Sequence, residues 1–175
     1  MIFKIIGFCF VVLTLVGCNN AKPSKPTHKH YTKHKLFQSV DENKAIILQS
    51  GKNKNYCSRC GMKLAKYYKT NHVATYKGKV YQYCSLHCLE DHLEDGVVLK
   101  NPKVVDTASL KFISIANAVY VVGSNRDATM SRVSKYAFSS LADAKKFQSK
   151  YGGEIMDFNS ARQKAQQDFK YKRKY

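Results

Sequence analysis

Residues 56–62 of this chain read YCSRCGM, and residues 83–89 read YCSLHCL. The two clusters carry four cysteines, one methionine and one histidine. Between them, β-branched and aromatic residues alternate on both sides of Gly78, which predicts a β-hairpin that returns the second cluster to the first. Thiolate, thioether and imidazole ligands suit Cu(I), Zn(II) or another thiophilic ion. We therefore expect a metal site around which the rest of the fold is arranged.

The first cluster has the spacing of a chelating turn. Cys57 and Cys60 are two residues apart, so their thiolates can hold one ion. Gly61 follows them and gives the backbone conformations that other residues resist. Met62 adds a neutral thioether, a ligand that favours Cu(I) and contributes little to a zinc site.

The second cluster opens a predicted helix. Ser85 is a suitable N-cap, and Gly96 a suitable end. Cys84 and Cys88 are four residues apart, so they share one face about a turn apart. His87 can lean to the same side as Cys84. A thiolate at a helix N-terminus is also stabilised by the helix dipole, which lowers its pKa.

The order CxxCGM, then YxGKxYxYCS and a last cysteine, resembles the YHS/TRASH type of heavy-metal-binding module. Its usual second pair has two residues between the cysteines, whereas this chain has three. His87 is either a ligand or a surface histidine, and we expect His72 and His92 to be packing or surface residues. The resemblance and the spacing predict these ligands: Cys57, Cys60, Cys84, His87 and Cys88.

The first 17 residues read as a targeting segment. Lys4 is followed by an apolar run that is too short to span a bilayer and is typical of a signal-peptide core. The run ends LVGC at residues 15–18, which resembles a bacterial lipoprotein signal and implies that Cys18 becomes the lipidated first residue. An ordinary secretory signal is the alternative. Cys9 is lost with the signal and Cys18 would be blocked as a thioether, so four of the six cysteines remain for chemistry.

Export changes which partners and which sulfur chemistry are plausible. The chain carries 30 Lys+Arg against 12 Asp+Glu, a formal charge of +18. Outside the cytoplasm this charge faces lipid headgroups or an acidic protein, and we expect no nucleic-acid partner. The oxidising bacterial envelope also favours disulfides, so two disulfides, or one disulfide with two buried thiols, compete with the metal site.

Residues 18–35 are polar and basic and contain Pro23 and Pro26, a composition typical of a flexible tether. We expect a solvated basic tether; a weak metal-capture role is the alternative for its histidines, which are His28, His30 and His34.

The second half has the same pattern as the first. Residues 133–136 align with 80–83, and a helix is predicted after both. Strands are expected at residues 112–116, 118–122, 132–136 and 154–158, with a helix from Ser140 to Gly152 and a helical, basic tail from 160 to 175. These patterns predict an α+β fold of two similar ββαβ units packed together, 36–105 and 106–175. The second unit lacks cysteines, but Met130 lies in its polar loop, as a ligand or as a surface-packed side chain.

The second half resembles the NosL family, accessory lipoproteins of nitrous-oxide reductase. The resemblance rests on YVVGS at 120–124, the helix FSSxxDAxxF at 138–147 and YGGxIMDF at 151–158, with CGM at 60–62 in the first half. It implies two ββαβ units, Cu(I) binding, and delivery of copper to the reductase with a membrane ABC-type complex as handover partner. Cys60, Met62 and Met130 match the family's motif positions.

The sequence therefore favours a periplasm-facing lipoprotein that binds Cu(I) and supplies it to a copper enzyme; Zn is the alternative metal. Asn19 does not resemble an inner-membrane retention signal, so we expect the outer membrane. The alternatives are a structural or interaction lipoprotein stapled by disulfides or Zn, and a general heavy-metal-binding protein. We do not expect an enzyme: the CxxC is not set in a thioredoxin-like βαβ pattern, and no acid accompanies the cysteine pair as in organomercurial lyase.

Overall fold

The computed structural model describes residues 35–172, which form one compact unit. The predicted signal peptide, the lipidation residue Cys18 and the tether up to residue 34 lie outside the described residues. The strands are β1 (His72–Tyr76), β2 (Lys79–Tyr83), β3 (Lys100–Val105), β4 (Phe112–Ser114), β5 (Val119–Val122), β6 (Lys135–Phe138) and β7 (Glu154–Met156). The helices are α1 (Leu86–Leu93), α2 (Leu141–Tyr151) and α3 (Phe158–Lys172), with short 3₁₀ segments η1 (Glu42–Lys44), η2 (Leu64–Thr70) and η3 (Ile115–Asn117).

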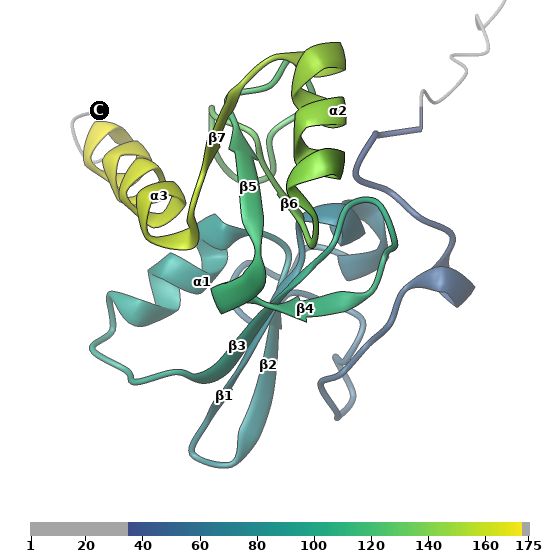
Figure 1. The fold of residues 1–175 in the computed structure, drawn as a ribbon. Coiled ribbons are helices and arrows are strands. Elements are labelled where there is room, and N and C mark those ends of the chain that lie inside the picture. Colours follow the sequence, from purple (N-terminus) through teal and green to yellow (C-terminus); the bar gives the residue numbers. More distant parts are fainter. Residues whose placement is uncertain (1–34, 173–175) are drawn as a thin grey trace, which may run out of the picture. The chain divides into compact units, whose positions relative to one another are not determined.

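Two antiparallel sheets repeat one topology. The first has the strand order β2-β1-β3-β4 and the second has the order β6-β5-β7. In each, a hairpin is followed by a helix and by a strand that pairs with the first strand of the hairpin (Figure 1). The predicted α+β fold with two similar ββαβ units is confirmed. The first sheet also takes β4 from beyond residue 105.

The β1–β2 hairpin forms where the alternating pattern predicts it. Its turn residues Lys77 and Gly78 both have positive φ, 47° and 75°. Two consecutive residues in this region make the turn whose twist matches that of the flanking strands. The hairpin places Cys84 directly after β2 and opposite the loop that carries Cys57 and Cys60.

Three strand limits in the second half differ from prediction for local reasons. The strand expected at 112–116 ends at Ser114, because the Ser114 hydroxyl accepts from the Ala116 N–H (3.3 Å) and starts η3. The strand expected at 132–136 begins only at Lys135, because the Ser131 hydroxyl donates to the Val133 carbonyl (2.6 Å) and closes a turn there. The strand expected at 154–158 ends at Met156, because the Asp157 carboxylate accepts from the Ser160 N–H (2.7 Å) and starts α3.

Both predicted helix starts are confirmed. The Ser85 hydroxyl accepts from the N–H of Cys88, and the Ser140 hydroxyl accepts from the N–H groups of Ala142 and Asp143. Each serine satisfies N–H groups that have no partner inside the helix.

Aromatic side chains build much of the interior. The second sheet packs against α2 through Tyr136, Phe138 and Phe147. Phe37 joins this cluster from the N-terminal segment, with its ring 5.3 Å from that of Tyr136. Residues 36–48, which show no clear periodicity, are thus held by side-chain contacts and by backbone hydrogen bonds to η2, and only the short η1 is regular there.

Polar and charged contacts join the two sheets. The ring of His72 in β1 lies between the Thr70 carbonyl and the Tyr120 hydroxyl of β5, 3.0 Å from each. Helix α3 lies beside α1 (Figure 1), where Arg162 makes a two-point ion pair with the buried Glu90 at 2.7 and 3.1 Å. In residues 35–172, no helix has the length and apolar character needed to cross a membrane.

Candidate metal centre

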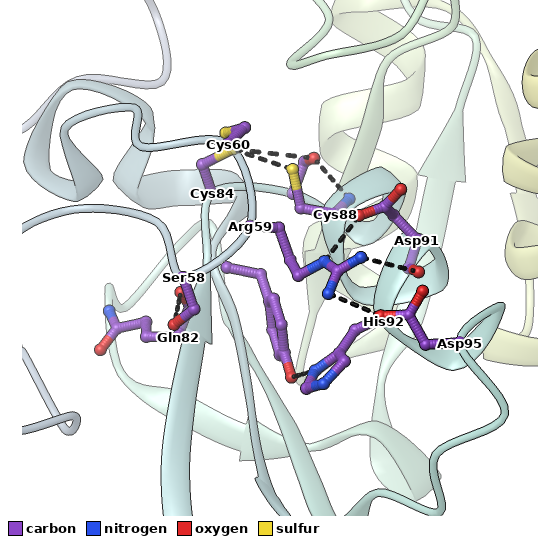
Figure 2. A network of polar contacts seen from close by, with 11 residues as sticks. Ser58, Arg59, Cys60, Gln82, Cys84, Cys88, Asp91, His92 and Asp95 are labelled. Carbon is purple, nitrogen blue, oxygen red and sulfur yellow. Dashed lines mark hydrogen bonds and ion pairs between the residues drawn. The ribbon is translucent and has the colours of Figure 1, made fainter.

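Four cysteine sulfurs meet at the junction of the first loop and α1. The Sγ atoms of Cys57, Cys60, Cys84 and Cys88 all lie within 4.8 Å of one another. The Sγ atoms of Cys60 and Cys84 are 3.5 Å apart, and those of Cys84 and Cys88 are 3.6 Å apart (Figure 2). A tetrahedral ion with sulfur at about 2.3 Å would set its ligands about 3.8 Å apart. The four cysteines are free thiols in this structure, at a spacing close to that of a four-sulfur site.

Backbone contacts shape the first loop. The Cys57 N–H donates to the Met62 carbonyl (2.8 Å), and the Gly61 N–H donates back to the Cys57 carbonyl (3.0 Å). Gly61 has φ +72°, where a residue with a side chain would be strained. The Ser58 N–H donates to the Gln82 carbonyl (3.0 Å), which fixes the loop to the outer edge of β2. Both cysteines of the loop therefore face the end of β2.

The second pair closes despite its extra residue. Cys84 precedes the Ser85 cap, whereas Cys88 lies in the first turn of α1, so the chain between them is not a full helical turn. The Thr70 hydroxyl donates to the Cys84 carbonyl (2.7 Å) and lies 2.9 Å from the Thr129 hydroxyl. The backbone at Cys84 is thus tied to the loop that carries Met130.

Arg59, between the first two cysteines, links their loop to α1. Its Nε donates to the Asp91 carboxylate (2.6 Å) and its Nη1 donates to the Asp95 carboxylate (2.7 Å). Figure 2 shows the guanidinium between these carboxylates, beside the cysteines. One side chain therefore holds the two cysteine pairs of the cluster against each other.

The thiols differ in exposure and in acidity. Cys57, Cys84 and Cys88 are buried, and Cys60 reaches the surface. Hydrogen bonds from Cys60, Cys84 and Cys88 hold the pKa of Cys57 below its usual range. Cys57 raises the pKa of Cys60, but Cys84 and Cys88 lower it, and the result is about 7. The pKa values of Cys84 and Cys88 are raised, first by Cys57 and then by Cys60. The first pair thus ionises more readily than the second.

Met62 and Met130 lie around the same core. Both are partly buried and pack against the hydrophobic cluster that includes Cys57, Cys84 and Cys88. Met130 has φ +60°, an uncommon backbone conformation for a residue with a side chain.

The predicted histidine ligand lies apart from the sulfur cluster. His87 is buried and lines a small pocket with Thr70, Thr129 and Ser131. Among residues 35–172, the group of His, Cys, Asp and Glu ligand atoms close enough to share an ion contains only the four cysteines.

Two other histidines have packing roles. His72 is fully buried between the Thr70 carbonyl and the Tyr120 hydroxyl, and burial lowers its pKa to about 4. His92 packs among the rings of Tyr76, Tyr81 and Tyr83, with its Nδ1 2.8 Å from the Tyr83 hydroxyl.

Sequence reasoning missed the residues that position the cysteines. Asp91 and Asp95 are four apart and so share a helix face, which was the available signal for a cationic partner such as Arg59. Gln82 gave no such signal, although its buried side chain donates to the Asn71 side chain (3.0 Å) and accepts from the Leu48 N–H (2.9 Å).

Comparisons with known proteins place the chain in a family. The NosL family model matches residues 48–165. The crystal structure of the copper chaperone NosL from Shewanella denitrificans is similar with a TM-score of 0.51 and 24% identity, covering 70% of this chain and 94% of that one. At this identity the likeness supports the fold. No curated protein matches the chain. These findings confirm the NosL resemblance and the prediction that this chain is not an enzyme.

Proposed function

Because this chain belongs to the NosL family, we propose that it is a copper chaperone that binds Cu(I) through its cysteine cluster. The observation that carries the proposal is the meeting of four free sulfurs within 4.8 Å, from two segments that the hairpin brings together. One similar protein of known structure, NosL from Shewanella denitrificans, is described as a copper chaperone. Thiolate ligands are soft and select Cu(I) over hard cations.

The geometry also suits release of the ion. Cys60 is the sulfur that reaches the surface, so an acceptor ligand can approach the ion from its side. Met62 and Met130 pack on the same hydrophobic cluster as the buried cysteines. We propose that their thioethers serve as Cu(I) ligands together with Cys60, at the positions that match the family motif. An ion held by exchangeable sulfur ligands can move to a recipient one ligand at a time.

The recipient in this proposal is a copper enzyme such as nitrous-oxide reductase, reached directly as the apo enzyme or through a membrane ABC-type complex. The lipid anchor at Cys18 and the tether 18–35 would hold the domain on the periplasmic side of the outer membrane. A tether of this composition lets the domain move between donor and acceptor while it stays at the membrane surface.

One observation favours a second function. Three of the four cysteines are buried, and the sulfur spacing is near that of a closed four-thiolate site, which is how structural zinc is held. In that case Zn(II) staples the first unit, and copper is not the cargo of this cluster.

The test is a set of matched variants in a fragment, residues 19–175, that contains the whole compact unit. Anaerobic Cu(I) affinity is measured against a competing chelator for Cys60→Ser, Met62→Leu and Met130→Leu. The control is Met156→Leu, which changes a methionine of β7 that packs on the same hydrophobic cluster but is not among the proposed ligands. We expect the first three to weaken binding and the control to leave it unchanged. If Met130→Leu behaves like the control, the two units do not share the ion. If Cys60→Ser also binds normally, the proposed site is wrong.

A further inference from the structure

Strand β2 lies at an edge of the first sheet, and the outward backbone N–H and C=O of one of its residues are available for hydrogen bonding. The order β2-β1-β3-β4 leaves one side of β2 without a neighbouring strand. Gln82 turns its N–H and C=O to this side, where they meet the Gln49 side chain (2.9 Å) and the Ser58 N–H (3.0 Å). The register pairs Gln82 with Val73 and Val80 with Thr75, so the Val80 backbone has the same outward orientation.

An open groove of about 650 Å³ lies along this edge. Its lining includes Lys79, Val80 and Tyr81 of β2 and, from the segment before the cysteine loop, residues 49–53 and Tyr56. Within residues 35–172, the outward N–H and C=O of Val80 have no hydrogen-bond partner. An unpaired N–H and C=O at a sheet edge offer themselves to an added strand.

The groove borders the metal centre. Cys57, Ser58 and Gly61 belong to its lining, and Cys57 is one of the four clustered cysteines. A chain segment seated beside Val80 would therefore lie next to the loop that holds the first cysteine pair.

The charged side chains in the lining of the groove are both lysines, and the tyrosine Tyr56 is exposed there. The lining contains Lys52 and Lys79, both exposed, and no aspartate or glutamate. Tyr56 is 45% exposed and is one of the large apolar side chains that reach the surface. Exposed tyrosines are common anchors of protein interfaces because they present both apolar area and a hydroxyl.

We propose that this groove, defined by Lys52, Tyr56, Lys79 and Val80, is the docking site for an extended acidic segment of the protein that receives the metal. The segment adds to the edge of β2 through the Val80 N–H and C=O, its carboxylates meet Lys52 and Lys79, and an apolar side chain rests on Tyr56. The proposal rests on the proposed function, since it places the acceptor beside the cysteine loop.

The probe is the blocked hexapeptide Glu-Val-Glu-Val-Glu-Val, whose alternation puts its carboxylates on one face of a strand. The blocked peptide Lys-Val-Lys-Val-Lys-Val is its charge-reversed counterpart. Binding to the 19–175 fragment is measured by NMR titration, and hydrogen exchange of the Val80 amide is followed in the same samples. Variants are Lys52→Glu with Lys79→Glu, and Val80→Pro, which removes the donor where an edge strand tolerates proline. Lys111→Glu, before the opposite edge strand, is the matched control.

We expect the acidic peptide to bind, to slow exchange of the Val80 amide, and to lose affinity as salt rises. The double charge reversal should weaken binding about tenfold, and Val80→Pro should weaken it as well, while Lys111→Glu leaves it unchanged. The proposal is overturned by absence of binding, by equal binding of the basic peptide, or by unchanged Val80 exchange at saturation. Concentration-dependent Val80 protection without peptide would instead identify a second copy of this chain as the occupant.

Cu(I) affinity of the same variants separates the two proposals. The double charge reversal and Val80→Pro should bind Cu(I) as the unsubstituted fragment does. If the peptide binds as expected but the fragment does not hold Cu(I), the groove stands and the proposed function fails. If Cu(I) binds and the peptide does not, the groove alone is wrong.

Discussion

Arg59 allows the link between fold and metal site to be tested through a single contact. Replacing it with glutamine, Arg59→Gln, removes the charge that joins the cysteine loop to Asp91 and Asp95. The side chains of these three residues are 26%, 42% and 52% exposed, so both ion pairs are screened by water. Exposed pairs contribute about 0.2–1 kcal/mol each, and loss of both should lower the free energy of unfolding by about 1 kcal/mol.

The expected effect on metal affinity follows from the same loss of about 1 kcal/mol. The ion needs both cysteine pairs in place, and Arg59 helps to hold them together before the ion arrives. If the full 1 kcal/mol is lost from the arrangement that binds metal, the dissociation constant rises about fivefold. The assay is anaerobic chelator competition with the 19–175 fragment, combined with denaturant unfolding of the metal-free fragment. The Arg59→Gln/Asp91→Asn double variant should lose less than the two single variants added together.

Lys35→Gln is the matched control, because it breaks another exposed ion pair, Lys35–Asp41 at 2.8 Å, away from the cysteines. It should leave metal affinity unchanged. If Arg59→Gln affects metal affinity no more than Lys35→Gln does, the clamp does not position the site. High salt should reduce the difference in metal affinity between Arg59→Gln and Lys35→Gln, since it screens the ion pairs of Arg59.

Other residues give separate predictions. Arg162→Gln removes the ion pair of the Glu90 carboxylate, which is 2% exposed, and leaves it the hydrogen bond from Gln166. It should lower the free energy of unfolding, measured with denaturant, by about 2–3 kcal/mol and should change metal affinity less than Arg59→Gln does. In the folded protein His72 has a pKa of about 4, below its unfolded value, so it contributes stability above pH 6.5 that is lost as the pH falls from 6.5 towards 4, by about 3 kcal/mol at most. His72→Gln should flatten the pH dependence of the unfolding free energy, and an equal slope in both proteins would refute the assignment. Cys18→Ser in the full-length protein should abolish lipidation and move the protein out of the membrane fraction; retention there would contradict the lipoprotein prediction.

Local patterns were sufficient to predict much of the fold. The hairpin, the two serine caps and the repeated strand-strand-helix order depend on residues close in sequence, where periodicity and turn chemistry act directly. The meeting of the cysteines was also predictable, because the hairpin returns Cys84 to the loop of Cys57.

Local sequence patterns could not predict the long-range contacts that hold the metal site in place. Arg59 reaches residues 32 and 36 positions away, and His72 reaches Tyr120 across the two sheets. Such pairings depend on how complete units pack, which no short window of sequence contains. Residues 36–48 have no local pattern that predicts their structure for the same reason, since they are held by contacts of Phe37 and of the Gln82 side chain with residues far away in the sequence.

The central claim is that the four clustered cysteines form a copper site. Anaerobic titration of the reduced 19–175 fragment with Cu(I), and separately with Zn(II), against a competing chelator tests it most directly. The account predicts tight Cu(I) binding at a small whole-number stoichiometry, weaker Zn(II) binding, and loss of the tight site in Cys57→Ser and Cys84→Ser. A preference for Zn(II), or Cu(I) binding that survives both substitutions, would contradict it.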